Sequence, residues 1–187
     1  MVLGWLRRFG LRRSQRPLDD HLQVFTADDY AQALARVTQE VFKWEPLDKA
    51  CKELAREATD PEAIWFEAGS LVHALLRYAI HPIQALQVQA CQTAAAIFAR
   101  NAAMRELPDG QLNNFLAAFE ARVAQYQAAL DSPDSPWRVP RMLASSIGVT
   151  DPFPTLRFGA VQIPLLGLLK DAVSHLHFTP PIAGPGA

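Results

Sequence analysis

The residues that could carry out chemistry lie together in one segment of the chain. At helical spacing between residues 61 and 79 the sequence places Glu67, Ser70, His73 and Arg77. Side chains three or four residues apart on a helix can hydrogen-bond or form ion pairs with one another. A nucleophile and a base on one helix, with no strand–turn elbow or glycine loop around them, are a weak catalytic signal. We therefore expect these four residues to form a polar stripe on the surface or along a groove.

Metal and cofactor chemistry has even less support. His175 and His177 lie about 200° apart around a helix, so they cannot share a metal ion. Asp171 and His175 could share one, but two ligands are too few for a zinc site. The chain contains no phosphate-binding loop, dinucleotide fingerprint, HExxH motif or GxSxG motif. We accordingly expect no metal site, no cofactor and no catalytic centre.

The segment that positions the polar stripe is the least charged part of the chain. Between Glu67 and Arg100 the only residue with a full charge is Arg77. Apolar residues recur at helical spacing before and after His81-Pro82, which indicates two helices separated by that break. Because burial of apolar side chains drives folding, we expect this pair at the centre of the protein. Glutamines in the second helix and the polar stripe of the first argue against a membrane span.

The remaining helical segments are expected to cover the central pair. One begins at a capping box formed by Thr26 and Asp29, and the next restarts at Pro46. The clearest amphipathic pattern covers residues 111–130, which we expect to pack across the pair. A short helix follows over residues 140–147, and Pro164 kinks or starts the last helical region.

These elements predict an all-α protein of six to eight helices. We expect one helical domain over residues 18–178, a basic flexible or amphipathic arm over residues 1–17, and a disordered tail over residues 179–187. The domain is either a helical bundle or a short, irregular stack of helical repeats.

An internal similarity bears on the choice between bundle and stack. HPIQALQVQACQTAAAIF aligns with DPFPTLRFGAVQIPLLGL, which pairs Pro82 with Pro152 and Gln92 with Gln162. An acidic residue followed by proline, and then by an apolar stripe that contains alanines, resembles the helix start of HEAT-type repeats. The resemblance implies a stacked scaffold that binds partners along one side. The separation of the two segments exceeds the ~40–47-residue HEAT period, and alanine-rich helices capped by Asp-Pro look alike in many proteins, which favours the bundle.

The N-terminal arm carries the strongest charge signal. The chain has 18 Lys and Arg, and five of these arginines lie in residues 1–17, which contain no acidic residue. The remaining residues contain 13 Lys and Arg and 19 Asp and Glu, so the rest of the chain is acidic. The candidate binding residues of the arm are Trp5, Arg7, Arg8, Phe9, Arg12, Arg13 and Arg16. Such a segment suits an anionic membrane surface or nucleic acid. The alternatives are a solvated arm or one that packs Trp5 and Phe9 on its own protein.

A second basic and aromatic cluster lies in the sequence WRVPR. It contains Trp137, Arg138 and Arg141, and its simplest interpretation is a loop anchored by a buried Trp137. The two cysteines, Cys51 and Cys91, lie on predicted apolar helix faces, which is typical of a reducing compartment. Arginines interrupt the first sixteen residues where a secretory signal would need an apolar stretch. We expect a cytoplasmic protein, and the arm leaves four alternatives open: contact with a membrane, with nucleic acid, with a protein, or with nothing.

Three functions are compatible with the sequence. The first is a non-catalytic interaction protein, an adaptor or regulator, whose arm contacts an anionic surface, a protein partner or a second copy of the chain. The second is a nucleic-acid-binding protein that uses the arm with Arg138 and Arg141, as a dimer, although the acidic remainder of the chain counts against it. The third is a small helical enzyme with its site on the polar stripe.

Overall fold

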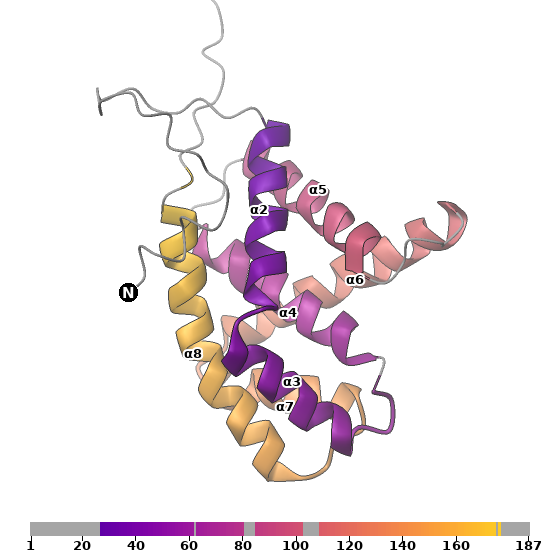
Figure 1. Ribbon diagram of the computed structural model, residues 1–187, viewed down its shortest axis with the longest axis vertical. Helices are drawn as coiled ribbons and strands as arrows, with labels where there is room; N and C mark the ends of the chain where they lie inside the picture. The colour runs from indigo at the N-terminus through magenta and orange to yellow at the C-terminus, as the bar shows by residue number, and fades with distance from the viewer. Residues whose placement is uncertain (1–26, 62, 81–84, 103–108, 175, 177–187) are drawn as a thin grey trace, which may run out of the picture.

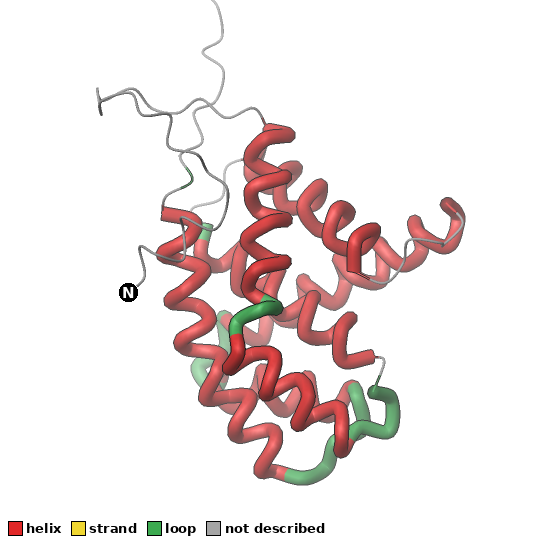
Figure 2. Tube along the Cα trace, in the orientation of Figure 1, coloured by secondary structure: helices red, strands yellow, loops and turns green. Residues whose placement is uncertain are grey.

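The computed structural model describes residues 27–61, 63–80, 85–102, 109–174 and 176. This part of the chain is built from seven helices and contains no strand (Figure 1, Figure 2). The helices are α2 (Ala27–Val41), α3 (Glu45–Glu57), α4 (Ala63–Ala79), α5 (Ala85–Ala102), α6 (Asp109–Leu130), α7 (Ser135–Ser146) and α8 (Pro152–Ser174). The prediction of an all-α protein is confirmed. The arm, the His81-Pro82 break, Thr26 of the capping box, His175, His177 and the tail lie outside the described residues.

Local sequence signals set several helix ends. The backbone N–H of Ala63 donates to Asp60 Oδ1 at 3.2 Å, so Asp60 caps α4 as expected. Proline lies in the first turn of α3 and of α7, where its missing N–H removes no intrahelical bond. After α7, Gly148 adopts a φ of 74°, a left-handed conformation that glycine takes without strain.

Helix α4 is the centre of the fold. Its residues from Glu67 to Leu76 are all buried, which means that the helix is covered around its whole circumference. Helices α6 and α8 supply most of this cover, and α3, α7 and α5 supply the rest. The expectation that the first of the two low-charge helices lies at the centre is therefore confirmed.

Helix α5 does not form the expected central pair with α4. It packs mainly along α2 and makes few contacts with α4. Small buried side chains on both partners, such as Ala31 of α2 and Ala94 of α5, let these two helices lie close together. On its other side α5 exposes Val88, Gln89 and Gln92. The low charge of α5 thus reflects one well-packed face rather than complete burial.

Two helix boundaries differ from the sequence prediction. Helix α7 begins at Ser135 and contains Pro140, where the pattern predicted a start at Pro140. Helix α8 begins at Pro152 and continues through Pro164, which neither starts nor ends it. Each proline removes one backbone hydrogen bond of its helix. Pro140 is itself buried, and Pro164 is followed by the buried Leu165, so packing of these segments outweighs the low helix propensity of proline.

The environments of the cysteines and of the apolar helices are also clear. Cys51 and Cys91 are both free and buried, as their positions on apolar faces predicted. Burial raises the pKa of each thiol, to about 12 for Cys51 and about 11 for Cys91, so both stay protonated. No helix within the described ranges has the length and apolar character needed to cross a bilayer.

Candidate functional site

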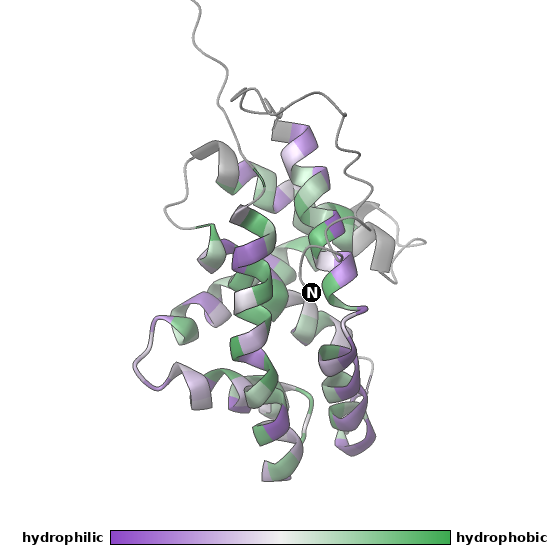
Figure 3. Cartoon of the chain, turned by 60° about the vertical axis from the view of Figure 1, so that its left-hand side comes forward, coloured by the Kyte–Doolittle hydropathy of each residue, from purple (hydrophilic) through white to green (hydrophobic). Residues whose placement is uncertain are grey.

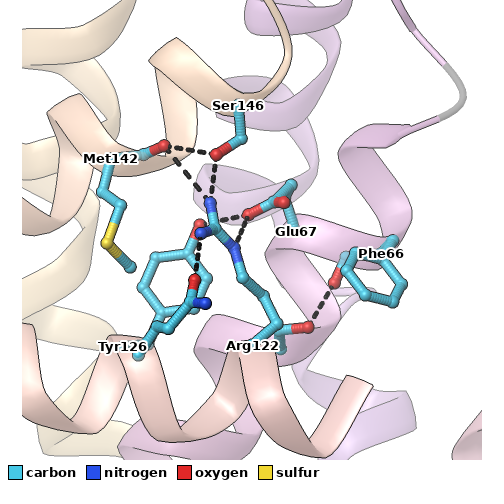
Figure 4. A network of polar contacts seen from close by, with 8 residues as sticks. Phe66, Glu67, Arg122, Tyr126, Met142 and Ser146 are labelled. Atoms are coloured by element: carbon cyan, nitrogen blue, oxygen red, sulfur yellow. Dashed lines mark hydrogen bonds and ion pairs between the residues drawn. The ribbon is translucent and has the colours of Figure 1, made fainter. Parts of the chain in front are cut away.

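The polar residues of α4 lie in its contact with α6, and Glu67 is the most strongly held. Glu67 Oε2 accepts a hydrogen bond from Tyr126 Oη at 2.5 Å and one from Arg122 Nε at 2.8 Å (Figure 4). Arg122 also donates to Gln125 and to Ser146, which connects α6 to the C-terminal end of α7. The Glu67 carboxylate is therefore paired and hydrogen-bonded inside the protein, as a buried charge requires.

The protonation states in this cluster follow from its surroundings. Burial raises the pKa of Tyr126 well above its usual range, and the neighbouring Glu67 carboxylate raises it further. The hydroxyl therefore stays protonated and remains a donor to Glu67. The Arg122 guanidinium also lies over the Tyr126 ring, 4.9 Å from its centre. This arrangement joins α4, α6 and α7 through one carboxylate oxygen of Glu67 and the Arg122 guanidinium.

Arg77 and Ser70 are also bound to the protein itself. Arg77 Nη2 donates to both carboxylate oxygens of Glu120 on α6, at 2.6 and 2.7 Å. The Arg77 side chain is only 13% exposed. Ser70 Oγ donates to the carbonyl oxygen of Phe66 one turn earlier at 2.8 Å. Both side chains thus bond to groups of the protein itself.

His73 has the most unusual environment of the four. It is fully buried, and its ring lies 5.4 Å from the rings of Phe98 and Phe119. Neither ring nitrogen has a hydrogen-bond partner among the described residues. Burial, with a smaller contribution from Arg77, lowers the pKa of His73 to about 3. The imidazole is therefore neutral over the physiological range and acts as a packed aromatic ring.

The predicted polar groove is therefore not present on α4. Glu67, Ser70 and His73 are buried, and Arg77 is nearly so. Sequence reasoning placed them on a solvated or groove-lining face because they alternate with an apolar stripe on α4. What it missed is that α6 brings Arg122 and Tyr126 to Glu67 and brings Glu120 to Arg77. It also missed that His73 packs against the aromatic rings of Phe98 and Phe119.

The basic and aromatic cluster on α7 is exposed. Trp137 is 58% exposed rather than buried, so the interpretation as a loop anchored by this side chain is wrong. Arg138 and Arg141 are exposed on the same helix. The pKa of the Asp134 carboxyl is lowered, mainly by a hydrogen bond from the Ser132 hydroxyl. The positive charges of Arg138 and Arg141 lower it further. The cluster is therefore partly neutralised at the start of α7.

A larger surface feature lies on α8. Phe153, Leu156 and Ile163 are 71%, 48% and 70% exposed, and Ala160 and Gly167 are exposed between and beyond them. We call these five residues the α8 stripe. Its members alternate three and four residues apart, which places them on one helix face. The opposite face, with Phe158, Gln162, Leu165, Leu169 and Ala172, is buried.

Neighbouring elements extend the surface around the α8 stripe. Figure 3, in which the side of the molecule with α8 comes forward, shows hydrophobic residues along much of that helix. On one side, Gly159 packs against Pro140 and near the carbonyl of Pro136, next to Trp137. On the other side, an open pocket of about 330 Å³ is lined by Trp44, Pro164, Gly167, Leu168 and Asp171.

The α8 stripe was not predicted, although the sequence contains its signal. Helix α8 is apolar on both faces, and Arg157 is its only charged residue between Phe153 and Gly167. That pattern indicates a helix covered on all sides, whereas the structure covers only one. Arg157 itself pairs with Glu53 of α3 at 3.1 Å, at the edge of the exposed face.

Comparison with known proteins adds no further information about this surface. No protein-family model, curated protein or solved structure matches the chain. Within the described ranges, no group of three or more His, Cys, Asp or Glu side chains is arranged to hold a metal ion. The function has to be inferred from the geometry and charge of the surface.

Proposed function

We propose that this protein is a non-catalytic helical interaction protein, an adaptor or regulator, that binds an apolar helix of a protein partner along the α8 stripe. The exposed row of Phe153, Leu156 and Ile163 is the observation that carries the proposal. Contact between water and a contiguous apolar surface is unfavourable, so such a surface is typically covered by another molecule. A row with members three and four residues apart fits a second helix, because helices pack by interlocking such rows.

The charge of the surface favours a protein helix over an anionic membrane. Membrane-surface helices carry several Lys and Arg residues along their apolar face. The α8 stripe is bordered by two cations, Arg157, which pairs with Glu53, and Lys170, which lies near the Tyr78 ring. The open pocket beside Gly167 also favours a side chain from a partner over an enclosed small molecule, because ligand sites bury most of their ligand.

The basic arm belongs to the same proposal as a second contact. Five arginines without an acid, attached to a chain that is otherwise acidic, favour contact with an anionic surface or an acidic partner. Its residues lie outside the described ranges, so this contact is proposed from the sequence alone.

Site-specific photo-crosslinking in cells of the native host tests the proposal. Ile163 is replaced with the photo-crosslinker p-benzoylphenylalanine, and Ala124, exposed on α6, is replaced in the control. We expect a crosslinked protein product from position 163 and none from position 124. Absence of a product at position 163, or equal products at both positions, contradicts the proposal. The same replacement at Trp5 tests the arm, which contributes only if a protein or lipid product forms there.

A further inference from the structure

Large and small side chains follow one another along the α8 stripe in an order that lets two copies of the stripe fit together, with large residues of one opposite small residues of the other. Along the helix the order is Phe153, Leu156, Ala160, Ile163 and Gly167. We propose that the partner helix is α8 of a second copy, packed antiparallel about a two-fold axis that passes between Ala160 and Ile163. This inference rests on the proposed function, because it names the partner of the same surface.

The antiparallel arrangement places each large side chain opposite a small one. With the axis midway between Ala160 and Ile163, Ala160 faces Ile163 of the second copy, and the reverse pair forms by symmetry. Leu156 then faces Gly167 of the second copy. A two-fold interface must be complementary to itself, and small residues opposite large ones let two helices interlock at close range.

The next pair outward is also compatible. In the same register Phe153 faces Lys170 of the second copy. Lys170 Nζ already lies 5.8 Å from the centre of the Tyr78 ring, so its ammonium group is placed near aromatic surface. An aromatic ring next to a lysine is a favourable neighbour, because the ring face attracts a cation.

A parallel arrangement of the same two helices fits much less well. It would place Phe153 opposite Phe153, Ala160 opposite Ala160 and Gly167 opposite Gly167. Large residues would then hold the helices apart at one end, and the glycines would leave a gap at the other. The order of residue sizes therefore selects the antiparallel arrangement.

The structure contains space for the incoming leucine. A Cβ placed on Gly167 meets no heavy atom of the described residues within 4 Å, so this part of the structure leaves the helix surface open there. The pocket of about 330 Å³ that Trp44 and Leu168 help to line is next to this glycine. In the antiparallel register Leu156 of the second copy lies opposite Gly167, which is one of the residues that line this pocket. The contact thus combines a protruding side chain on one copy with a recess on the other.

The extent of the contact sets the strength of the dimer. The α8 stripe runs over about 21 Å of helix, which is short for a stable interface. Trp137, exposed beside the contact between α7 and α8, adds apolar area at one side. We therefore expect a dimer that forms at tens of micromolar and dissociates on dilution.

Light scattering coupled to size-exclusion chromatography measures this dimer directly. Over a series of loading concentrations that reaches well above tens of micromolar, we expect the mass of the full chain to rise toward twice that of one 20.7-kDa chain, and Ile163→Asp to show the mass of one chain throughout. Ile163 is 70% exposed, so the variant keeps its fold, which circular dichroism checks. Val88→Asp, on the exposed side of α5, is the matched control and should remain dimeric. A monomeric wild type, or a dimer that Ile163→Asp leaves intact, overturns the inference.

Disulfide trapping tests the register. We expect a mixture of Leu156→Cys and Gly167→Cys chains to form a disulfide-linked dimer under oxidation, and Leu156→Cys chains alone to form none. The two native cysteines are buried, so they do not interfere. Efficient crosslinking of Leu156→Cys alone indicates a parallel pair and contradicts the register. If the chain is monomeric while position 163 crosslinks to a different protein, the dimer is wrong and the interaction function holds.

Discussion

Glu67 shows how a charge is kept at the centre of this protein. Its carboxylate accepts hydrogen bonds from Arg122 and Tyr126, and both donors belong to α6. A buried carboxylate that keeps its partners is tolerated, whereas the loss of one partner leaves a charge without compensation. Arg122 therefore contributes to stability by neutralising the buried charge of Glu67.

Replacing Arg122 should destabilise the protein strongly. We expect Arg122→Ala to lower the free energy of unfolding by about 3 kcal/mol, because the Glu67 carboxylate stays buried without its cation. The matched control is Arg157→Ala, which removes an arginine that is 68% exposed and pairs with Glu53 at the surface. That control should cost less than about 1 kcal/mol. Urea unfolding measures both values, and similar small losses for the two variants would contradict the role given to Arg122.

His73 should make stability depend on pH. Its pKa is lowered to about 3 in the folded protein and is near 6.5 in the unfolded chain. Between these values the unfolded chain binds a proton that the folded protein does not bind. Stability therefore falls as the pH decreases from 6.5 toward 3, by up to about 1.4 kcal/mol per pH unit.

The variant His73→Leu should remove this dependence. It should also be more stable than wild type at pH 7, by about 1 kcal/mol, because two buried nitrogens without partners are replaced by apolar atoms. The difference between variant and wild type should grow by about 2 kcal/mol when the pH is lowered from 7.5 to 5. Urea unfolding at several pH values measures this difference. Equal slopes for the two proteins would mean that His73 takes up a proton without unfolding.

At the scale of helices, hydrogen bonds join the turn after α7 to the loop that precedes α4. The carbonyl oxygen of Ile147 accepts hydrogen bonds from the Thr59 backbone N–H at 3.0 Å and from Thr59 Oγ1 at 3.3 Å. Gly148 follows with a positive φ, and a Cβ at this position would collide with the Thr59 side chain. The turn holds the loop between α3 and α4 against α7.

Gly148→Ala should therefore cost more than conformational strain alone. The positive φ contributes about 1–2 kcal/mol of destabilisation, and the collision with Thr59 adds to it. In the double variant Gly148→Ala/Thr59→Ala the collision is relieved, so its loss should be smaller than the sum of the two single losses. Thermal or urea unfolding of the three variants measures this coupling. Strictly additive losses would show that Gly148 and Thr59 do not constrain each other.

At the scale of the whole molecule, the cover around α4 is uneven. Helix α8 completes that cover with one face and leaves its opposite face, the α8 stripe, at the surface. A second copy in the antiparallel register would cover the stripe without disturbing the contacts that hold α8 to α3, α4 and α7. The proposed interaction surface is thus separate from the buried polar contacts of Glu67 and Arg77.

Many features of the fold could be predicted from the sequence because they depend on local patterns. The helical spacing of apolar residues predicts the all-α class, the central position of α4 and the helix over residues 111–130. Asp60 before Pro61 predicts the start of α4, since capping acts within one turn. The burial of Cys51 and Cys91 follows from their place on apolar faces.

Only the tertiary structure decided how these faces are paired. Sequence periodicity shows which side of a helix is apolar or polar, but it does not show which neighbour that side meets. Glu67 and Arg77 of α4 are covered because α6 brings Arg122 and Glu120 against them. Phe153 and Ile163 are exposed because α3, α4 and α7 all pack on the other side of α8. Burial depends on contacts between distant segments, and no single helix contains that information.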